Sequence, residues 1–148
     1  MGRTDRRPGI GRDSDAVAVV HRDGGRMTAQ RQHILSVIAR ADGHLPVAEI
    51  YAQVKHDLPW TAPSTIYRSL QRLQDLGLIH TLVVNDDIRY GPADAAHHHT
   101  VCTSCGAVGE IPVQALAEPL ALIERTTGMS IDASAGLTLR GLCSTCRH

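Results

Sequence analysis

The chain has very few aromatic side chains: three tyrosines, one tryptophan and no phenylalanine among its 148 residues. It contains no apolar run close to the roughly 20 residues that a membrane-spanning helix needs. Its start lacks the basic and then apolar segments of a secretion signal. Because 43% of the residues are hydrophobic, the composition is that of a globular protein with aliphatic cores, which we expect in the cytoplasm and not in a membrane.

Net charge is also absent, but only over the whole chain. Up to Asn85, eleven Lys and Arg residues stand against eight Asp and Glu, whereas beyond it four stand against seven. A neutral chain with a basic first half can bind a polyanion. The asymmetry is modest and does not indicate DNA by itself.

A chain of 16.0 kDa has room for one ordinary domain or two small ones. We expect a flexible basic tail over residues 1–25, where arginines lie among Gly, Asp and Pro without an apolar period. This tail is either a solvated leader or an arm that touches phosphates. Three further segments follow from the patterns described next: a winged-helix domain (26–91), a hinge (92–96) and a metal-binding domain (97–148).

The first half of the chain shows three helical patterns. Thr28 is placed to cap a helix that runs to about Arg40, and a second helix covers about residues 47–57. Ser64 is placed to cap a third helix, which Gly77 ends. Each has apolar residues at helical spacing.

Strand-like segments at 79–84 and 88–90 follow the third helix and flank the turn residues 85–87. Three helices followed by a β-hairpin predict a winged helix-turn-helix. Beyond the hinge, we expect a strand at 107–111, a helix at 113–127 and short strands at 130–132 and 137–140. The predicted fold class is therefore α/β in the mixed, α+β sense: a winged helix-turn-helix and a small α/β domain.

All four cysteines occur in two Cys-x-x-Cys pairs, Cys102 with Cys105 and Cys143 with Cys146. Tetrahedral zinc is bound by four such thiolates, and a Cys-x-x-Cys turn brings two of them to one side of the ion. A dithiol redox switch and unrelated buried cysteines are the alternatives, but a thioredoxin-type motif needs only one pair. We therefore expect one structural zinc per chain.

Three consecutive histidines, His97 to His99, precede the first cysteine pair. On a strand, His97 and His99 share one face and His98 lies on the other. His97 and His99 can therefore chelate one ion. The alternative is a solvated polar loop. His33 and His80 are interpreted as surface or core histidines, not as ligands.

Together these motifs resemble those of the ferric uptake regulator family of metal-responsive repressors. The resemblance rests on four stretches in order: Met27-Thr-Ala-Gln-Arg31; Ser64-Thr-Ile-Tyr-Arg-Ser-Leu70 with Leu76-Gly-Leu-Ile79; the histidine run through Cys105-Gly106; and Gly141-Leu-Cys-Ser-Thr-Cys146. It implies that the winged helix binds operator DNA and that the second domain forms a homodimer. The implied recognition helix spans Ser64 to Leu76, and the implied DNA-binding residues are Arg31, Ser64, Thr65, Tyr67 and Arg68.

The resemblance also implies a regulatory metal bound by His44, His97, His99 and Glu110. The remaining ligand stays open among Asp86, Asp87, Tyr90 and Asp94. Since His44 precedes the hinge and the other three follow it, metal occupancy would select one geometry of the dimer. A third metal site that many family members carry is not expected, because the corresponding positions hold Ala96, Ala117 and Ala135.

The leading hypothesis is a homodimeric repressor that binds a roughly palindromic, double-stranded operator when a divalent metal fills the regulatory site. Iron(II) or zinc suits three imidazoles and a carboxylate, as do manganese and nickel. An iron-dependent peroxide-sensing repressor on the same scaffold is the alternative. An enzyme is not expected, because four cysteine ligands leave zinc no open position and no catalytic group or small-molecule substrate is indicated.

Overall fold

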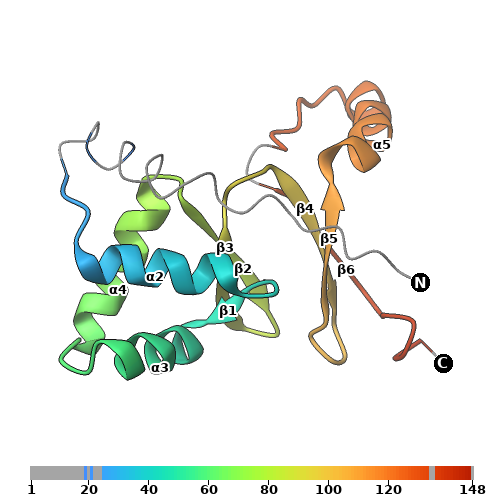
Figure 1. Cartoon of the computed structure of the whole chain (residues 1–148). Helices are drawn as coiled ribbons and strands as arrows, with labels where there is room; N and C mark the ends of the chain where they lie inside the picture. The colour runs from blue at the N-terminus through green and yellow to red at the C-terminus, as the bar shows by residue number, and fades with distance from the viewer. Residues whose placement is uncertain (1–18, 20, 22–24, 134–135, 148) are drawn as a thin grey trace, which may run out of the picture. The chain divides into compact units, whose positions relative to one another are not determined.

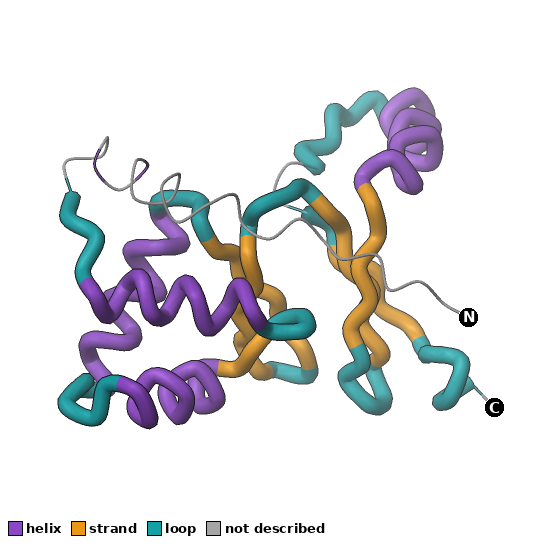
Figure 2. The backbone as a smooth tube through the Cα atoms, viewed as in Figure 1, coloured by secondary structure: helices purple, strands orange, loops and turns teal. Residues whose placement is uncertain are grey.

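The computed structural model describes residues 19, 21, 25–133 and 136–147. The described residues divide into two compact units, the first containing those up to 83 together with 87–94, and the second containing 84–86 and those from 95 onward. Each unit has one three-stranded sheet. Figure 2 shows that most of the helical structure belongs to the first unit. The predicted basic tail lies outside the described residues except at positions 19, 21 and 25.

Three helices form the bulk of the first unit: α2 (Ala29–Arg40), α3 (Val47–Asp57) and α4 (Pro63–Asp75). Helix α2 packs against both of the others (Figure 1). Their shared core is aliphatic, as the composition requires, and its fully buried side chains include Ile34, Ile38, Ile50, Val54, Ile66 and Leu73. All four aromatic residues of the chain, Tyr51, Trp60, Tyr67 and Tyr90, belong to this unit.

The N-terminal ends of α2 and α4 are stabilised in different ways. Thr28 caps α2 as predicted, since its hydroxyl accepts a hydrogen bond from the Arg31 backbone N–H at 3.2 Å. The prediction that Ser64 caps α4 is wrong. The helix begins one residue earlier, at Pro63, whose fixed φ and missing N–H suit the first helical position, and Ala62 precedes it without a side-chain cap.

The wing is a hairpin of β2 (Ile79–Val84) and β3 (Asp87–Pro92), and the short strand β1 (Leu45–Pro46) pairs with β3. Only Asn85 and Asp86 form the turn, both with positive φ, at 49° and 66°. Paired positive φ values give a turn whose twist matches that of the strands, so two residues suffice where three were expected. Three helices and this hairpin form a winged helix-turn-helix.

The second unit is a sheet with one helix. Strand β4 (His97–Cys102) lies between antiparallel β5 (Val108–Pro112) and parallel β6 (Thr138–Gly141), and α5 (Val113–Thr127) follows β5 directly (Figure 1). The strand predicted at 130–132 is absent from the described residues, and that segment is irregular. The predicted α+β class is confirmed.

Helix α5 has the predicted bounds, and Gly128 ends it in the left-handed conformation, with φ of 71°. None of its residues is buried in the isolated chain. Two of its apolar side chains, Leu122 and Ile123, are 57% and 46% exposed. Among the described residues, no helix is both long and apolar enough to cross a bilayer.

Candidate metal centres and nucleic-acid interface

The four cysteines converge in the second unit. Cys102 ends β4, Cys105 follows in the turn before β5, and Cys143 and Cys146 lie just beyond β6. Their sulfur atoms all lie within 4.8 Å of one another, and Cys105 Sγ is 3.7 Å from Cys143 Sγ. Four sulfurs about 2.3 Å from a tetrahedral zinc are about 3.8 Å apart, whereas a disulfide needs about 2.05 Å. The cluster fits one zinc ion and contains no disulfide.

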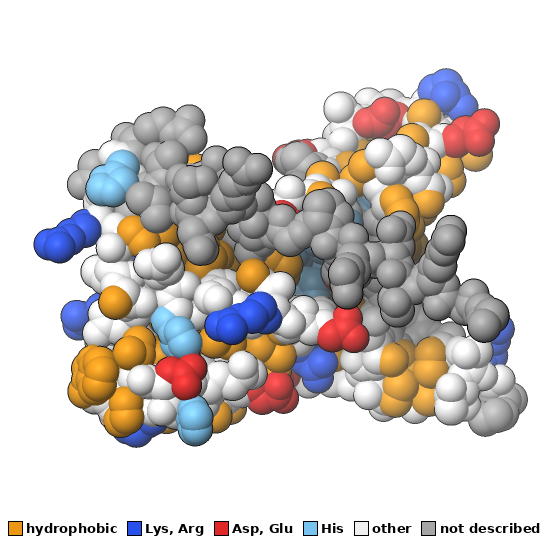
Figure 3. Space-filling model, viewed as in Figure 1, with side chains coloured by type: hydrophobic (Ala, Val, Ile, Leu, Met, Phe, Trp, Pro, Cys, Tyr) orange, Lys and Arg blue, Asp and Glu red, His pale blue; other side chains and the backbone are white. Residues whose placement is uncertain are grey.

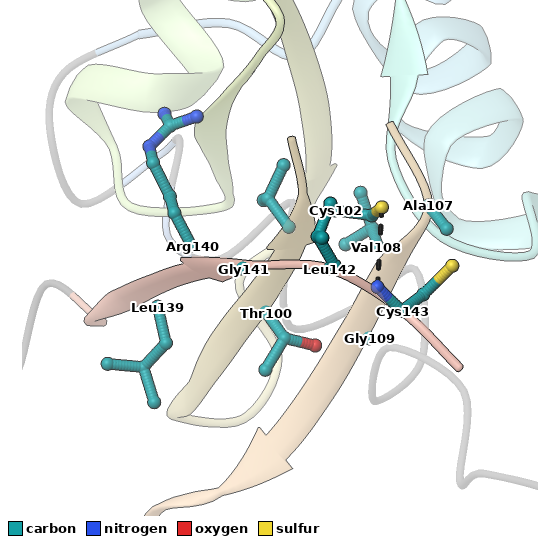
Figure 4. Close-up of a pocket in the computed structure, with 11 residues that line it drawn as sticks. Thr100, Cys102, Ala107, Val108, Gly109, Leu139, Arg140, Gly141, Leu142 and Cys143 are labelled. Atoms are coloured by element: carbon teal, nitrogen blue, oxygen red, sulfur yellow. Dashed lines mark hydrogen bonds between the residues drawn. The ribbon is translucent and has the colours of Figure 1, made fainter. Parts of the chain in front are cut away.

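Backbone amides lower the pKa of two of these thiols, those of Cys102 and Cys143. The N–H of Cys105 and then that of Cys143 lower the pKa of the Cys102 thiol to about 6. The bond from Cys143 N to Cys102 Sγ measures 3.4 Å and is drawn as the dashed line in Figure 4. The pKa of Cys143 is lowered in turn, first by the backbone N–H of Cys146. Zinc binds thiolates, so a lowered thiol pKa favours binding near neutral pH.

The predicted histidine pair is present on β4. The rings of His97 and His99 lie edge to face with centroids 4.6 Å apart, which confirms that they share one face of the strand. The Nδ1 of His97 is 2.7 Å from the carbonyl oxygen of Ala95. That contact makes Nδ1 the protonated nitrogen, so Nε2 carries the lone pair that a metal would take.

Glu110 is positioned by the register of the sheet. On β5 it stands directly opposite His99 on β4, so both side chains project from the same face. The carboxylate and the two imidazoles therefore come from one face of two paired strands. These three residues of the second unit form the part of the predicted regulatory ligand set that lies beyond the hinge.

His98 has a different role from its neighbours. It is 1% exposed, and its Nδ1 accepts a hydrogen bond from the Leu137 backbone N–H at 3.1 Å. Next to it, the His99 backbone N–H donates to the Leu137 carbonyl oxygen at 2.7 Å. His98 thus fastens the segment before β6 to β4.

The first unit holds a second histidine pair that the sequence analysis missed. His44 Nε2, in the loop before β1, lies 2.7 Å from His80 Nε2 on β2. His44 is 8% exposed, and a Cβ built on Gly91 would lie 2.4 Å from its ring. The ring therefore packs directly on the Gly91 backbone. The sequence analysis interprets His80 as a surface or core histidine. No local pattern in the sequence indicates that this half-buried residue contacts His44, 36 residues away.

The residues predicted to bind DNA lie on α4 and α2. On α4, Ser64, Tyr67 and Arg68 are exposed and Thr65 is half-buried, all within its first two turns. Tyr67 is 56% exposed, so partial packing leaves most of its ring accessible. Arg31 on α2 is half-buried, and its Nη1 donates to the Arg26 carbonyl oxygen at 2.8 Å.

An open depression of about 440 Å³ lies on the sheet of the second unit (Figure 4). Its lining includes Leu139 and Leu142, which are 46% and 52% exposed. Like the apolar side chains of α5, these residues leave apolar surface open on the single chain.

A winged helix-turn-helix followed by an α/β unit with a four-cysteine metal site defines the class of metal-binding winged-helix proteins. The model of the ferric uptake regulator family matches residues 22–138, and the chain belongs to that family. Members of the family are transcription regulators, not enzymes.

Two relatives and one solved structure show how far the likeness extends. The ferric uptake regulation protein of Bacillus subtilis is 32% identical over 133 residues, which cover 86% of this chain and 89% of that protein. The peroxide-responsive repressor PerR of Staphylococcus saprophyticus is 28% identical over 134 residues, 90% of each chain. The Helicobacter pylori ferric uptake regulator, a structure with three functional metal binding sites, has a TM-score of 0.76 at 20% identity and covers 95% of this chain and 97% of that one. The last comparison shows the fold.

Proposed function

We propose that this protein is a metal-dependent repressor that binds a palindromic DNA operator as a homodimer when a divalent metal fills its regulatory site. The observation that carries the proposal is that each unit presents its own histidine pair. His44 and His80 belong to the unit with the recognition helix, and His97 and His99, beside Glu110, belong to the other.

The proposed regulatory ligands are His44, His97, His99 and Glu110, as the family resemblance implies, together with His80. Imidazoles and one carboxylate suit iron(II), zinc, manganese or nickel. An ion that takes ligands from both units restrains the DNA-binding unit against the dimer-forming one. It thereby favours the arrangement for which its affinity is higher, and the coupling is reciprocal: operator DNA should raise the affinity for the metal.

On the DNA side, α4 is the proposed recognition helix. Residues near the N-terminal end of such a helix enter the major groove, and here they are Ser64, Thr65, Tyr67 and Arg68, with Arg31 on α2 near the backbone. Two copies would read two half-sites, and phosphate contacts would make the affinity fall with salt. Because the target is chromosomal DNA, we place the protein in the cytoplasm.

The proposed dimer uses the second unit. Its support is the set of apolar side chains exposed on the single chain by α5, by β6 and by the residue after β6: Leu122, Ile123, Leu139 and Leu142. Large apolar side chains exposed on a small unit are typical of an interface. The structural zinc on Cys102, Cys105, Cys143 and Cys146 would hold the sheet that carries both this surface and the histidines of β4.

A DNA-binding assay with and without metal tests the proposal. Protein with its structural zinc site filled selects its operator from random DNA in the presence of one added metal: iron(II) under anaerobic conditions, zinc, manganese or nickel. The selected duplex is then titrated in chelator and in each metal, and sedimentation gives the mass of the complex. We expect one dimer per operator and a clear loss of affinity in chelator. Equal affinity in both conditions would contradict metal dependence.

A peroxide-sensing repressor is the second candidate, because a peroxide-responsive relative matches 90% of this chain and the ligand set admits iron. In that case peroxide would oxidise a ligand histidine of the iron-loaded protein and release the DNA. Mass spectrometry of the treated protein should then find one added oxygen on His44, His97 or His99. If the histidines stay unmodified and DNA binding is retained, peroxide sensing is excluded and the metal-dependent repressor is the remaining candidate.

A further inference from the structure

Trp60, the only tryptophan of the chain, stands in the loop between α3 and α4 with 73% of its surface exposed. Figure 3 shows hydrophobic side chains gathered on the surface at the end of the first unit where this loop lies in Figure 2. An indole is the largest apolar side chain and also carries a hydrogen-bond donor, so a partner surface that is apolar in one part and polar in another suits it.

Backbone hydrogen bonds hold the turn that carries Trp60. The Leu58 N–H donates to the Val54 carbonyl oxygen at 2.8 Å, and the Thr61 N–H donates to the Leu58 carbonyl oxygen at 3.0 Å. The second bond closes a tight turn with Pro59 and Trp60 at its centre. Thr61 is 2% exposed and anchors the chain two residues before α4 begins. Because the backbone of the turn is already ordered, a partner that binds here does not have to order it.

The charges around the turn favour a polyanion. From Lys55 to Gln74 the sequence contains three basic residues, Lys55, Arg68 and Arg72. The one acidic residue of this stretch, Asp57, contacts His33 and His56. The N-terminal end of α4 adds the partial positive charge of a helix start. A second copy of the chain would bring another turn of the same charge to a two-fold contact, so DNA is the better partner.

We propose that Trp60 packs against the sugar-phosphate backbone of the bound operator, with its ring on a deoxyribose and its indole N–H donating to a phosphate oxygen. The inference rests on the proposed function, because it requires α4 to enter the major groove. The turn that precedes a recognition helix then stands at the edge of that groove, beside the backbone. Such a contact sets position and affinity, not sequence preference.

The intrinsic fluorescence of the wild-type protein tests this directly, since Trp60 is its only tryptophan. The probe is the operator duplex selected with the metal-loaded protein, and the anisotropy of an end-labelled copy reports binding independently. We expect saturating operator to change the Trp60 emission and to reduce its quenching by acrylamide. Both effects follow when an exposed indole is covered.

Substitutions supply the energetic test. Trp60→Ala should weaken operator binding about tenfold or more, as for an aromatic anchor at an interface. The same substitution should weaken binding to single-base variants of the operator by a similar factor, because the contact does not read sequence. The slope of log affinity against log salt should not change, because no charge is removed. Trp60→Phe keeps an aromatic ring but loses the N–H, so its operator affinity should lie between those of the wild type and Trp60→Ala. Arg68→Ala is the contrasting variant and should lower both affinity and slope.

Four results would overturn the inference. Operator binding by anisotropy with unchanged Trp60 emission, or with wild-type affinity in both Trp60 variants, removes Trp60 from the interface and leaves the proposed function standing. An emission shift that grows with protein concentration and ignores DNA assigns the indole to a second copy. Absence of operator binding in every metal removes the proposed function and this inference with it. Thermal melting compares the fold of each variant with that of the wild type.

Discussion

His44 and His80 meet through their Nε2 atoms, 2.7 Å apart, although 36 residues separate them. One of two neutral imidazoles at that distance donates a proton and the other accepts it. A metal that takes one of these nitrogens must break this hydrogen bond, and the imidazole that it binds through Nε2 carries its proton on Nδ1. The His44 ring also packs against the Gly91 backbone, which fixes that ring before any metal arrives.

The first prediction concerns His80. We expect His80→Ala to lower the affinity for the regulatory metal by about 10- to 100-fold, because it removes either a ligand or the group that orients His44. Competition with a chromophoric chelator, on protein whose zinc site is full, measures the affinity. His33→Ala is the matched control, since His33 contacts Asp57 at 2.9 Å. Equal effects of the two substitutions would show that His80 has no part in the site.

The second prediction concerns Glu110. Glu110→Gln keeps the size of the side chain but removes the charge that faces His99 across the sheet, and it should weaken the regulatory metal by at least about tenfold. The structural zinc should stay at one ion per chain. The exposed Glu118 on α5 gives the control, Glu118→Gln. A wild-type metal affinity in the Glu110 variant would remove the carboxylate from the proposed ligand set.

The third prediction concerns the zinc cluster. Cys105→Ser should reduce bound zinc from one ion per chain to nearly none, because a closed tetrahedral site depends on all four thiolates. Structural zinc contributes about 10 to 16 kcal/mol in small domains, so the second unit should lose hydrogen-exchange protection on β4 and β6. Atomic emission measures the zinc. Ser144→Ala, between the last two cysteines, should change neither quantity, and undiminished zinc in the Cys105 variant would refute the site.

The fourth prediction concerns pH. His56 Nδ1 lies 2.8 Å from Asp57 Oδ1, and this hydrogen bond, with the charge of His33 adding to it, lowers the pKa of Asp57 from its ordinary 3.8. A lowered folded-state pKa stabilises the fold above about pH 3.8, and the contribution is lost as the pH falls through the folded pKa. His56→Ala should raise the pKa of Asp57 towards 3.8, as an NMR titration of its carboxyl carbon would show. Gln53→Ala, elsewhere on α3, should leave that titration as it is.

Much of the fold could be predicted because local patterns decide it. The bounds of α3 and α5 follow from apolar spacing and from the residues that stop each helix. The start of α4 could not be assigned in the same way, because Ser64 and Pro63 are both helix-start residues at adjacent positions. The structure favours Pro63, whose ring leaves no amide to satisfy.

The candidate site was only half accessible to sequence reasoning. His97 and His99 stand two residues apart on one strand, so alternation alone predicts their shared face. The approach of His80 to His44 depends on how β2 packs beside the loop before β1, and no short-range pattern encodes that tertiary contact. The exposure of α5 has a similar cause, because spacing predicts an apolar face but does not say whether the same chain covers it.

The placement of the aromatic residues determines which half of the molecule optical methods can observe. Trp60 and the three tyrosines all belong to the first unit, so ultraviolet fluorescence and near-ultraviolet dichroism of aromatic side chains arise there alone. Melting or assembly of the second unit would be silent at these wavelengths unless it disturbed the first. A thermal transition followed by tryptophan emission is therefore the transition of the winged helix. The zinc-bearing unit has to be followed through its backbone amides or its metal.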